Sequence, residues 1–217
     1  MPERNRVIPT GDIVAVPLRG VWLGNRGMLH EGHEIVRQHA SPAWITCVLE
    51  FRGWVAPKWE PRRWTALFFH DEAVALAAGH RPCALCRRDA YTAYQRAVRV
   101  ATGREPLRAP ELDRRLHAER LVARSPGRAA AHVPRRRTHL MPWTGLPSGV
   151  FVVAPGGPAL VVGDAVIAWT TQGYGTRSAR PTRGDAEVLT PPTSVTAIGH
   201  GYRPQIDSAA TREVFAP

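Results

Sequence analysis

Apolar residues in this chain fall mostly into short runs separated by turn residues, a pattern typical of β-strands joined by tight turns. Near the amino terminus such runs cover residues 7–18, 21–23 and 43–52, and proline and glycine interrupt them. The same alternation returns from about residue 146 onward. Two β-rich regions are therefore expected, one toward each end of the chain.

The middle of the chain follows a helical pattern instead. Asp71 stands where an N-cap belongs, directly before the alanine-rich run 72–78, and Gly79 fits the left-handed stop of that helix. Two more helices are predicted at residues 89–100 and 111–124, because their apolar residues recur at helical spacing. The strand-rich ends therefore flank a short helical region.

The carboxyl-terminal region alternates apolar segments with proline and glycine turns. The strands predicted there are residues 150–154, 159–162, 165–170, 187–189 and 194–198. Strands this short, joined by tight turns, are typical of a small antiparallel β-sheet or a partly closed barrel.

The strongest chemical signal is the pair Cys83 and Cys86, whose Cys-x-x-Cys spacing lets both sulfurs reach one tetrahedral metal ion from a tight turn. Pro82 fixes the backbone just before the first thiol. Arg87 and Arg88 follow the second thiol, where their positive charge favours the thiolate form that binds metal. A single such pair is also compatible with a redox role or a coincidental spacing. We take zinc as the expected cofactor.

The cysteine pair lies in a longer pattern that reads Phe68-Phe69, a helix ending Ala77-Ala78-Gly79, and then Arg81-Pro82-Cys83-x-x-Cys86-Arg87. This pattern resembles the second half of the metal-binding domain of the Ada DNA-repair protein family, over about two dozen residues. The resemblance implies a zinc ion held by four cysteines, one of which accepts a methyl group from a DNA phosphotriester. The upstream Cys-x-x-x-Cys pair of that family is absent here, so the resemblance supports a zinc site more than methyl transfer.

Only Cys47 precedes this pattern, so at least one further ligand must be histidine or carboxylate. The glycine-rich stretch 24–34 offers His30 as the expected imidazole ligand. His33 in the same stretch and His80, three positions before Cys83, are alternatives. Cys47 alternates with apolar residues on a predicted strand and is also compatible with a buried, inert thiol. The predicted metal ligands are Cys83, Cys86, Cys47 and His30.

The charge balance is strongly basic, because 29 lysine and arginine residues stand against 18 acidic ones, for a net charge of +11. Lys58 is the single lysine, and the planar guanidinium of arginine suits phosphate, although a GC-rich genome also favours arginine. We therefore expect nucleic acid or another polyanion as a partner, with a merely solvated arginine surface as the alternative. The predicted contacts are Arg87, Arg88, Arg135, Arg136 and Arg137.

A proline- and arginine-rich stretch divides the chain. We expect an Ada-like zinc-binding region with short strands and helices at 1–124, a basic connector at 125–145 and a small antiparallel β domain at 146–217. The expected fold class is α+β, a small zinc-knuckle α/β unit followed by that β domain. With three cysteines and no apolar run of membrane-spanning length, a reduced cytoplasmic location and no membrane partner are expected.

Three functional hypotheses follow from these patterns. The preferred one is a zinc-binding protein with a basic surface for DNA or RNA, whose zinc is mainly structural. The alternatives are a zinc-dependent enzyme or DNA-repair-type protein that uses a zinc-activated thiolate or water, and an interaction module with structural zinc. No catalytic residue is assigned, because the chain lacks a P-loop, a His-Glu-x-x-His motif and a Gly-x-Ser-x-Gly motif.

Overall fold

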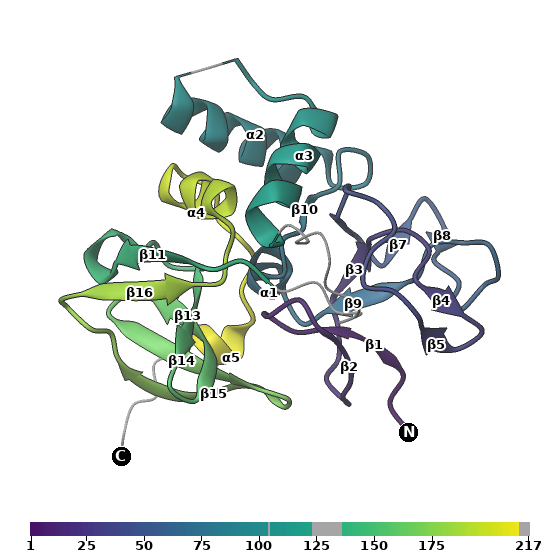
Figure 1. Ribbon diagram of the computed structural model, residues 1–217, viewed down its shortest axis with the longest axis horizontal. Helices are drawn as coiled ribbons and strands as arrows, with labels where there is room; N and C mark the ends of the chain where they lie inside the picture. Colours follow the sequence, from purple (N-terminus) through teal and green to yellow (C-terminus); the bar gives the residue numbers. More distant parts are fainter. Residues whose placement is uncertain (104, 123–135, 213–217) are drawn as a thin grey trace, which may run out of the picture.

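The computed structural model describes residues 1–103, 105–122 and 136–212. It is a mixed α+β protein in which a six-stranded sheet lies on each side of helix α1 (Figure 1). The strands before the connector are β1 (Arg4–Val7), β2 (Ile13–Ala15), β3 (Trp22–Asn25), β4 (His30–Glu31), β5 (Glu34–Ile35), β6 (Ile45–Cys47), β7 (Glu50–Phe51), β8 (Trp54–Val55), β9 (Leu67–Phe69) and β10 (Arg81–Pro82). The helices there are α1 (Glu72–Ala77), α2 (Arg88–Thr102) and α3 (Ala109–Arg120).

The first sheet is mixed and has the order β10-β6-β3-β9-β1-β2. β10 runs parallel to β6, and β1 runs parallel to β9, while β3 is antiparallel to both of its neighbours. Two small hairpins, β4-β5 and β7-β8, extend from it. The predicted strand-rich amino-terminal region is thus present, but β2, β6 and β7 cover only parts of the long apolar runs 7–18 and 43–52.

The second sheet has the open order β11-β16-β12-β13-β14-β15, and all of its pairs are antiparallel. Its elements, with the helices that follow, are β11 (His139–Pro142), η1 (Trp143–Gly145), β12 (Phe151–Ala154), β13 (Gly157–Val162), β14 (Ala165–Thr170), β15 (Gly173–Ala179), β16 (Asp185–Val188), α4 (Pro192–Gly199) and α5 (Ser208–Thr211). The predicted antiparallel sheet is confirmed, and the described strands do not close into a barrel.

One predicted strand is wrong, because residues 194–198 belong to helix α4. Proline at the first helical position has the fixed φ that a helix needs and lacks an N–H that would have no partner there. Pro192 therefore starts α4 where the sequence pattern had suggested only a turn. Val195 and Ile198 are three positions apart, which places both on the buried face of the helix.

Helix α1 is buried along its whole length between the two sheets. The Asp71 side chain caps it by accepting a hydrogen bond from the Val74 amide at 2.8 Å, as the sequence predicts. Its small alanine side chains let both sheets approach closely, and Gly79 turns the chain out of the helix with a φ of +88°.

The hydrophobic core draws on both sides of the connector. One cluster joins Tyr94 and Leu112 of the helices to Val152 and Val188 of the second sheet. The other joins α1 and β9 to Phe151 and neighbouring residues of the second sheet. The segment 83–86, which carries two of the cysteines, is consequently anchored to a large core rather than standing alone.

In the part of the chain that the structure describes, each helix is too short or too polar to cross a membrane.

Candidate metal centre

Two neighbouring strands bring the cysteines together. β6 ends at Cys47, and β10 lies beside it as the edge strand of the first sheet. The Cys83 amide donates to the Thr46 carbonyl at 2.9 Å, so Cys83 continues alongside the end of β6. Proline has no N–H to contribute to a sheet and is tolerated at an edge, which explains why Pro82 can stand in β10.

The turn between Cys83 and Cys86 leads directly into helix α2. The Leu85 amide donates to the Cys83 sulfur at 3.4 Å, and the Arg87 amide donates to the Cys83 carbonyl at 3.2 Å. These bonds close the turn and hold the second thiol near the first. The 15-residue helix begins at Arg88. Because a helix N-terminus carries partial positive charge, it favours thiolates at this position.

The Sγ atoms of Cys47, Cys83 and Cys86 lie within 4.8 Å of one another. Sulfurs that bind one tetrahedral zinc ion at about 2.3 Å are about 3.8 Å apart, so a small contraction would bring these three onto an ion. Cys83 is buried, the other two are half-buried, and all three are free thiols. The structure therefore contains a group that can hold a metal ion.

Hydrogen bonds among the sulfurs control the protonation of the group. The bond to Cys47 lowers the pKa of Cys83 to about 5 and also lowers the pKa of Cys86. The hydrogen bond to Cys83, followed by the hydrogen bond to Cys86, raises the pKa of Cys47. Cys83 therefore loses its proton most readily, and Cys47 holds its proton most strongly. A metal ion that binds all three sulfurs would displace that proton.

Two buried ion pairs support the cysteine turn from either side. Before it, Arg81 donates to both carboxylate oxygens of Asp113 at 2.7 and 2.8 Å, which joins β10 to α3. After it, Arg87 pairs with Glu72 at 2.7 Å and lies over the Trp22 ring, 3.9 Å from its centroid. These contacts join the start of α2 to α1 and fix both ends of the cysteine turn.

The three histidines that the sequence suggested are placed elsewhere. The His30 ring bonds Thr65 at 2.6 Å and the Glu60 carbonyl at 3.2 Å, so both of its nitrogens are engaged. His33 is exposed and stacks on Trp59. His80 is fully buried and accepts from Arg26 Nε at 3.2 Å. Among the described residues, the structure brings only the cysteines into the metal-binding group.

The arginines predicted to contact nucleic acid divide into two kinds. Arg87 is buried in its ion pair, and Arg136 is half-buried against the backbone carbonyls at the end of α1. Arg88 and Arg137 are exposed. Arg135 lies outside the described residues. Arg88 and Arg137 are therefore the members of the predicted set that the structure places on the surface.

Sequence reasoning missed Glu72 and Asp113, the acidic partners of the cysteine turn. A signal for them was present, because Arg81 and Arg87 flank the cysteines and a buried arginine needs a partner. The choice of carboxylate partners for these two arginines depends on how α1 and α3 pack. Helical spacing in the sequence does not contain that information.

Comparison with known proteins finds no matching family model, curated protein or solved structure. The resemblance to the Ada metal-binding domain therefore stays a prediction from the residues that carry it.

Proposed function

We propose that the protein binds one zinc ion through Cys47, Cys83 and Cys86. The observation that carries this proposal is the meeting of three sulfurs, from a strand end and a turn, within 4.8 Å of one another. Zinc accepts tetrahedral thiolate coordination and undergoes no redox change, so a cluster of cysteines in a reducing compartment suits it. The resemblance to the Ada domain favours the same ion.

The role proposed for this zinc is mainly structural. An ion bound by all three sulfurs would link the end of β6 to the turn after β10 and to the start of α2. The free energy of binding would then stabilise these segments against one another. Because the segment is anchored to a large hydrophobic core, we expect metal loss to loosen this region without unfolding the entire protein.

Metal analysis of the purified protein tests the proposal, together with replacement of zinc by Co²⁺, whose bonds to thiolate absorb strongly in the near ultraviolet. Separate Cys47→Ser, Cys83→Ser and Cys86→Ser variants should each weaken binding and reduce that absorption. The exposed His33→Gln variant is the matched control and should behave like the parent. Full occupancy in a Cys83→Ser, Cys86→Ser double variant would reject the proposal.

The alternative is an enzyme or repair-type protein, and one observation favours it. The described group supplies three protein ligands, and a tetrahedral ion has a fourth position that a water or a substrate could occupy. Adding a small thiol to the Co²⁺ protein distinguishes the two roles. A change in the visible spectrum would indicate an open position, whereas an unchanged spectrum would indicate a closed, structural site.

We further propose that the protein binds DNA or RNA through the exposed face of α2. Arg88, Arg96 and Arg99 are exposed and fall within about 80° of one another around the helix axis. This face begins next to the metal centre, and Arg137 offers a further surface charge. The net charge of +11 supplies the long-range attraction that such a face needs.

Binding titrations against a mixed-sequence duplex and a single strand, at several salt concentrations, test this second proposal. Replacing Arg88, Arg96 and Arg99 with glutamine should reduce the slope of log affinity against log salt by about two to three units. A triple variant at the exposed residues Arg19, Arg183 and Arg212 has the same net charge and is the control. Equal losses in both triple variants, or no binding by the parent at low salt, would contradict the proposal.

A further inference from the structure

Three arginines share one region at the end of α1, where Arg26 and Arg120 are buried and Arg136 is half-buried. The Cζ atoms of Arg26 and Arg120 lie 4.0 and 3.9 Å from the centroid of the Trp44 ring. Arg120 and Arg136 meet at Gly79, where a Cβ atom would lie 2.7 Å from Arg120 Cδ and 3.2 Å from Arg136 Nη1. None of the three forms an ion pair with a carboxylate among the described residues.

These guanidinium groups donate largely to backbone carbonyls. Arg26 Nη1 donates to the Gly11 carbonyl at 2.9 Å, and Arg120 Nη1 donates to the Gly79 carbonyl at 2.8 Å. Arg136 Nη1 donates to the Ala78 carbonyl at 3.3 Å. Carbonyl dipoles stabilise cations at the end of a helix but supply only partial charges. The region therefore retains a large excess of positive charge.

Each of the three side chains also keeps a polar atom without a partner. Arg26 Nη2, Arg120 Nε and Arg136 Nε are buried and make no hydrogen bond to any described residue. Burial, followed by repulsion from Arg136, lowers the pKa of Arg120 to about 9, and burial lowers the pKa of Arg136 to about 10. Unpaired, charged donors of this kind are expensive to bury, so a missing partner is expected.

A cavity lies beside two of these unpaired groups. Its volume is about 20 Å³, against the roughly 10–15 Å³ that a single water needs, so it can hold only one small group. Its lining consists of Thr10, Gly11, Asp12, Arg26, Gln38, Trp44, Leu121 and Arg136. Asp12 is the single carboxylate in that lining, and it is exposed. The cavity therefore has room for a small ion and a positive wall to hold it.

We propose that this cavity binds a small inorganic oxyanion of the phosphate class, held by Arg26 Nη2 and Arg136 Nε. Guanidinium N–H groups match the oxygens of such an anion in charge and geometry. Gly11 helps to leave the space open, since a Cβ there would lie 3.3 Å from Arg136 Cδ. This site shares no residue with the metal centre, so the two can be tested separately.

Calorimetric titration with inorganic phosphate, at constant ionic strength and with chloride as the competing anion, tests the proposal. Replacing the buried arginines could prevent folding, so the informative variants change charge at the lining. Asp12→Asn removes the competing carboxylate and should tighten phosphate binding by several-fold to about tenfold. Gln38→Glu adds a carboxylate of similar size and should weaken binding by a comparable factor.

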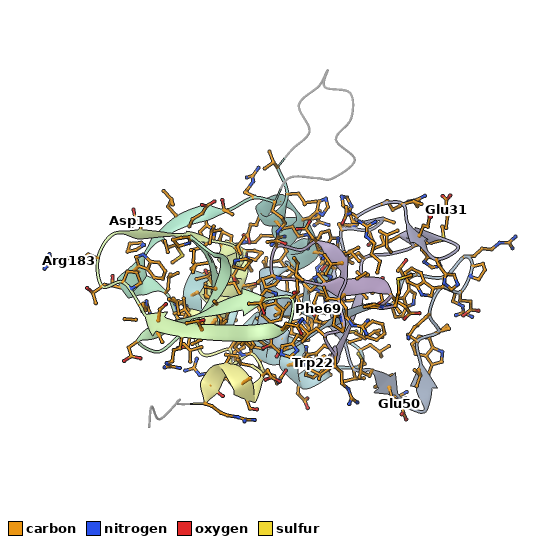
Figure 2. All side chains as sticks on the ribbon, turned by 90° about the horizontal axis from the view of Figure 1, so that it is seen from below. Trp22, Glu31, Glu50, Phe69, Arg183 and Asp185 are labelled. Atoms are coloured by element: carbon orange, nitrogen blue, oxygen red, sulfur yellow. The ribbon has the colours of Figure 1, made fainter. Side chains whose placement is uncertain are left out.

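Asp185→Asn is the matched control, because it makes the same charge change at an exposed residue that lies at one end of the molecule (Figure 2) and does not line the cavity. We expect saturable binding of one phosphate per chain, stronger in Asp12→Asn, weaker in Gln38→Glu and unchanged in Asp185→Asn. Absence of saturable binding would overturn the proposal. So would equal affinities in all variants, which would indicate a diffuse surface attraction instead of this cavity.

Discussion

Replacing Asp113 with asparagine should destabilise the protein by about 3–5 kcal/mol, because it leaves the charge of Arg81 buried without a carboxylate. The two side chains are only 5% and 8% exposed, and Arg81 reaches both carboxylate oxygens at 2.7 and 2.8 Å. Asparagine has nearly the same volume, so the loss would reflect charge and not packing. A protein of this size has about 5–15 kcal/mol of stability in total, so the loss is a large fraction of it.

Urea unfolding measures this effect. With a slope of about 2 kcal/mol per molar, the midpoint should fall by about 2 M. Lys58→Gln breaks the exposed pair with Glu3 and should cost at most about 1 kcal/mol, which makes it the control. An Arg81→Met, Asp113→Leu double variant should recover most of the loss, since it removes both charges. A loss below about 1 kcal/mol in Asp113→Asn would refute the reasoning.

Three further predictions test the core, the acid stability and the end of α1. Leu112→Ala should cost about 2–5 kcal/mol in calorimetric unfolding, because the side chain is buried in the core, and a smaller loss would contradict that placement. Burial, followed by repulsion from Arg26, lowers the pKa of His80 in the folded protein. As the pH falls below 6.5, His80 is therefore protonated in the unfolded chain before it is protonated in the folded protein. Stability should then decrease by up to about 1.4 kcal/mol per pH unit, and His80→Gln should reduce the slope measured by urea unfolding between neutral and acidic pH. Gly79→Ala should lower the melting temperature, because φ is +88° and the new Cβ would lie 2.7 Å from Arg120 Cδ; an unchanged value would argue against this backbone.

The features predicted correctly are those whose signals are local. Asp71 before an alanine run identifies the start of α1, and the observed cap confirms it. The predicted strand 165–170 agrees with β14 in both bounds, because turn residues mark each of its ends. Cys83 and Cys86 are three positions apart in sequence, so the spacing alone predicts that they approach each other.

The features that sequence reasoning missed, or reached only indirectly, depend on tertiary packing. Cys47 could be proposed as a ligand only by elimination, and its approach to the turn follows from the parallel pairing of β10 with β6. His30 has the right residue type for a zinc ligand, but its position in the β4-β5 hairpin gives its ring partners of its own. Residue type limits which side chains could be metal ligands, and the pairing of strands determines which of them come close together.

The net charge taken from the sequence does not show what each arginine does in this protein. A count of +11 predicts a basic surface, yet Arg26, Arg81, Arg87 and Arg120 are buried. Arg81 and Arg87 have carboxylate partners, and these pairs position the cysteine turn. Arg26 and Arg120 have none among the described residues, and Arg26 lines the cavity that we propose binds an anion. A paired and an unpaired arginine look alike in a sequence. The burial and pairing of each arginine must therefore be known before a binding partner can be inferred from the net charge.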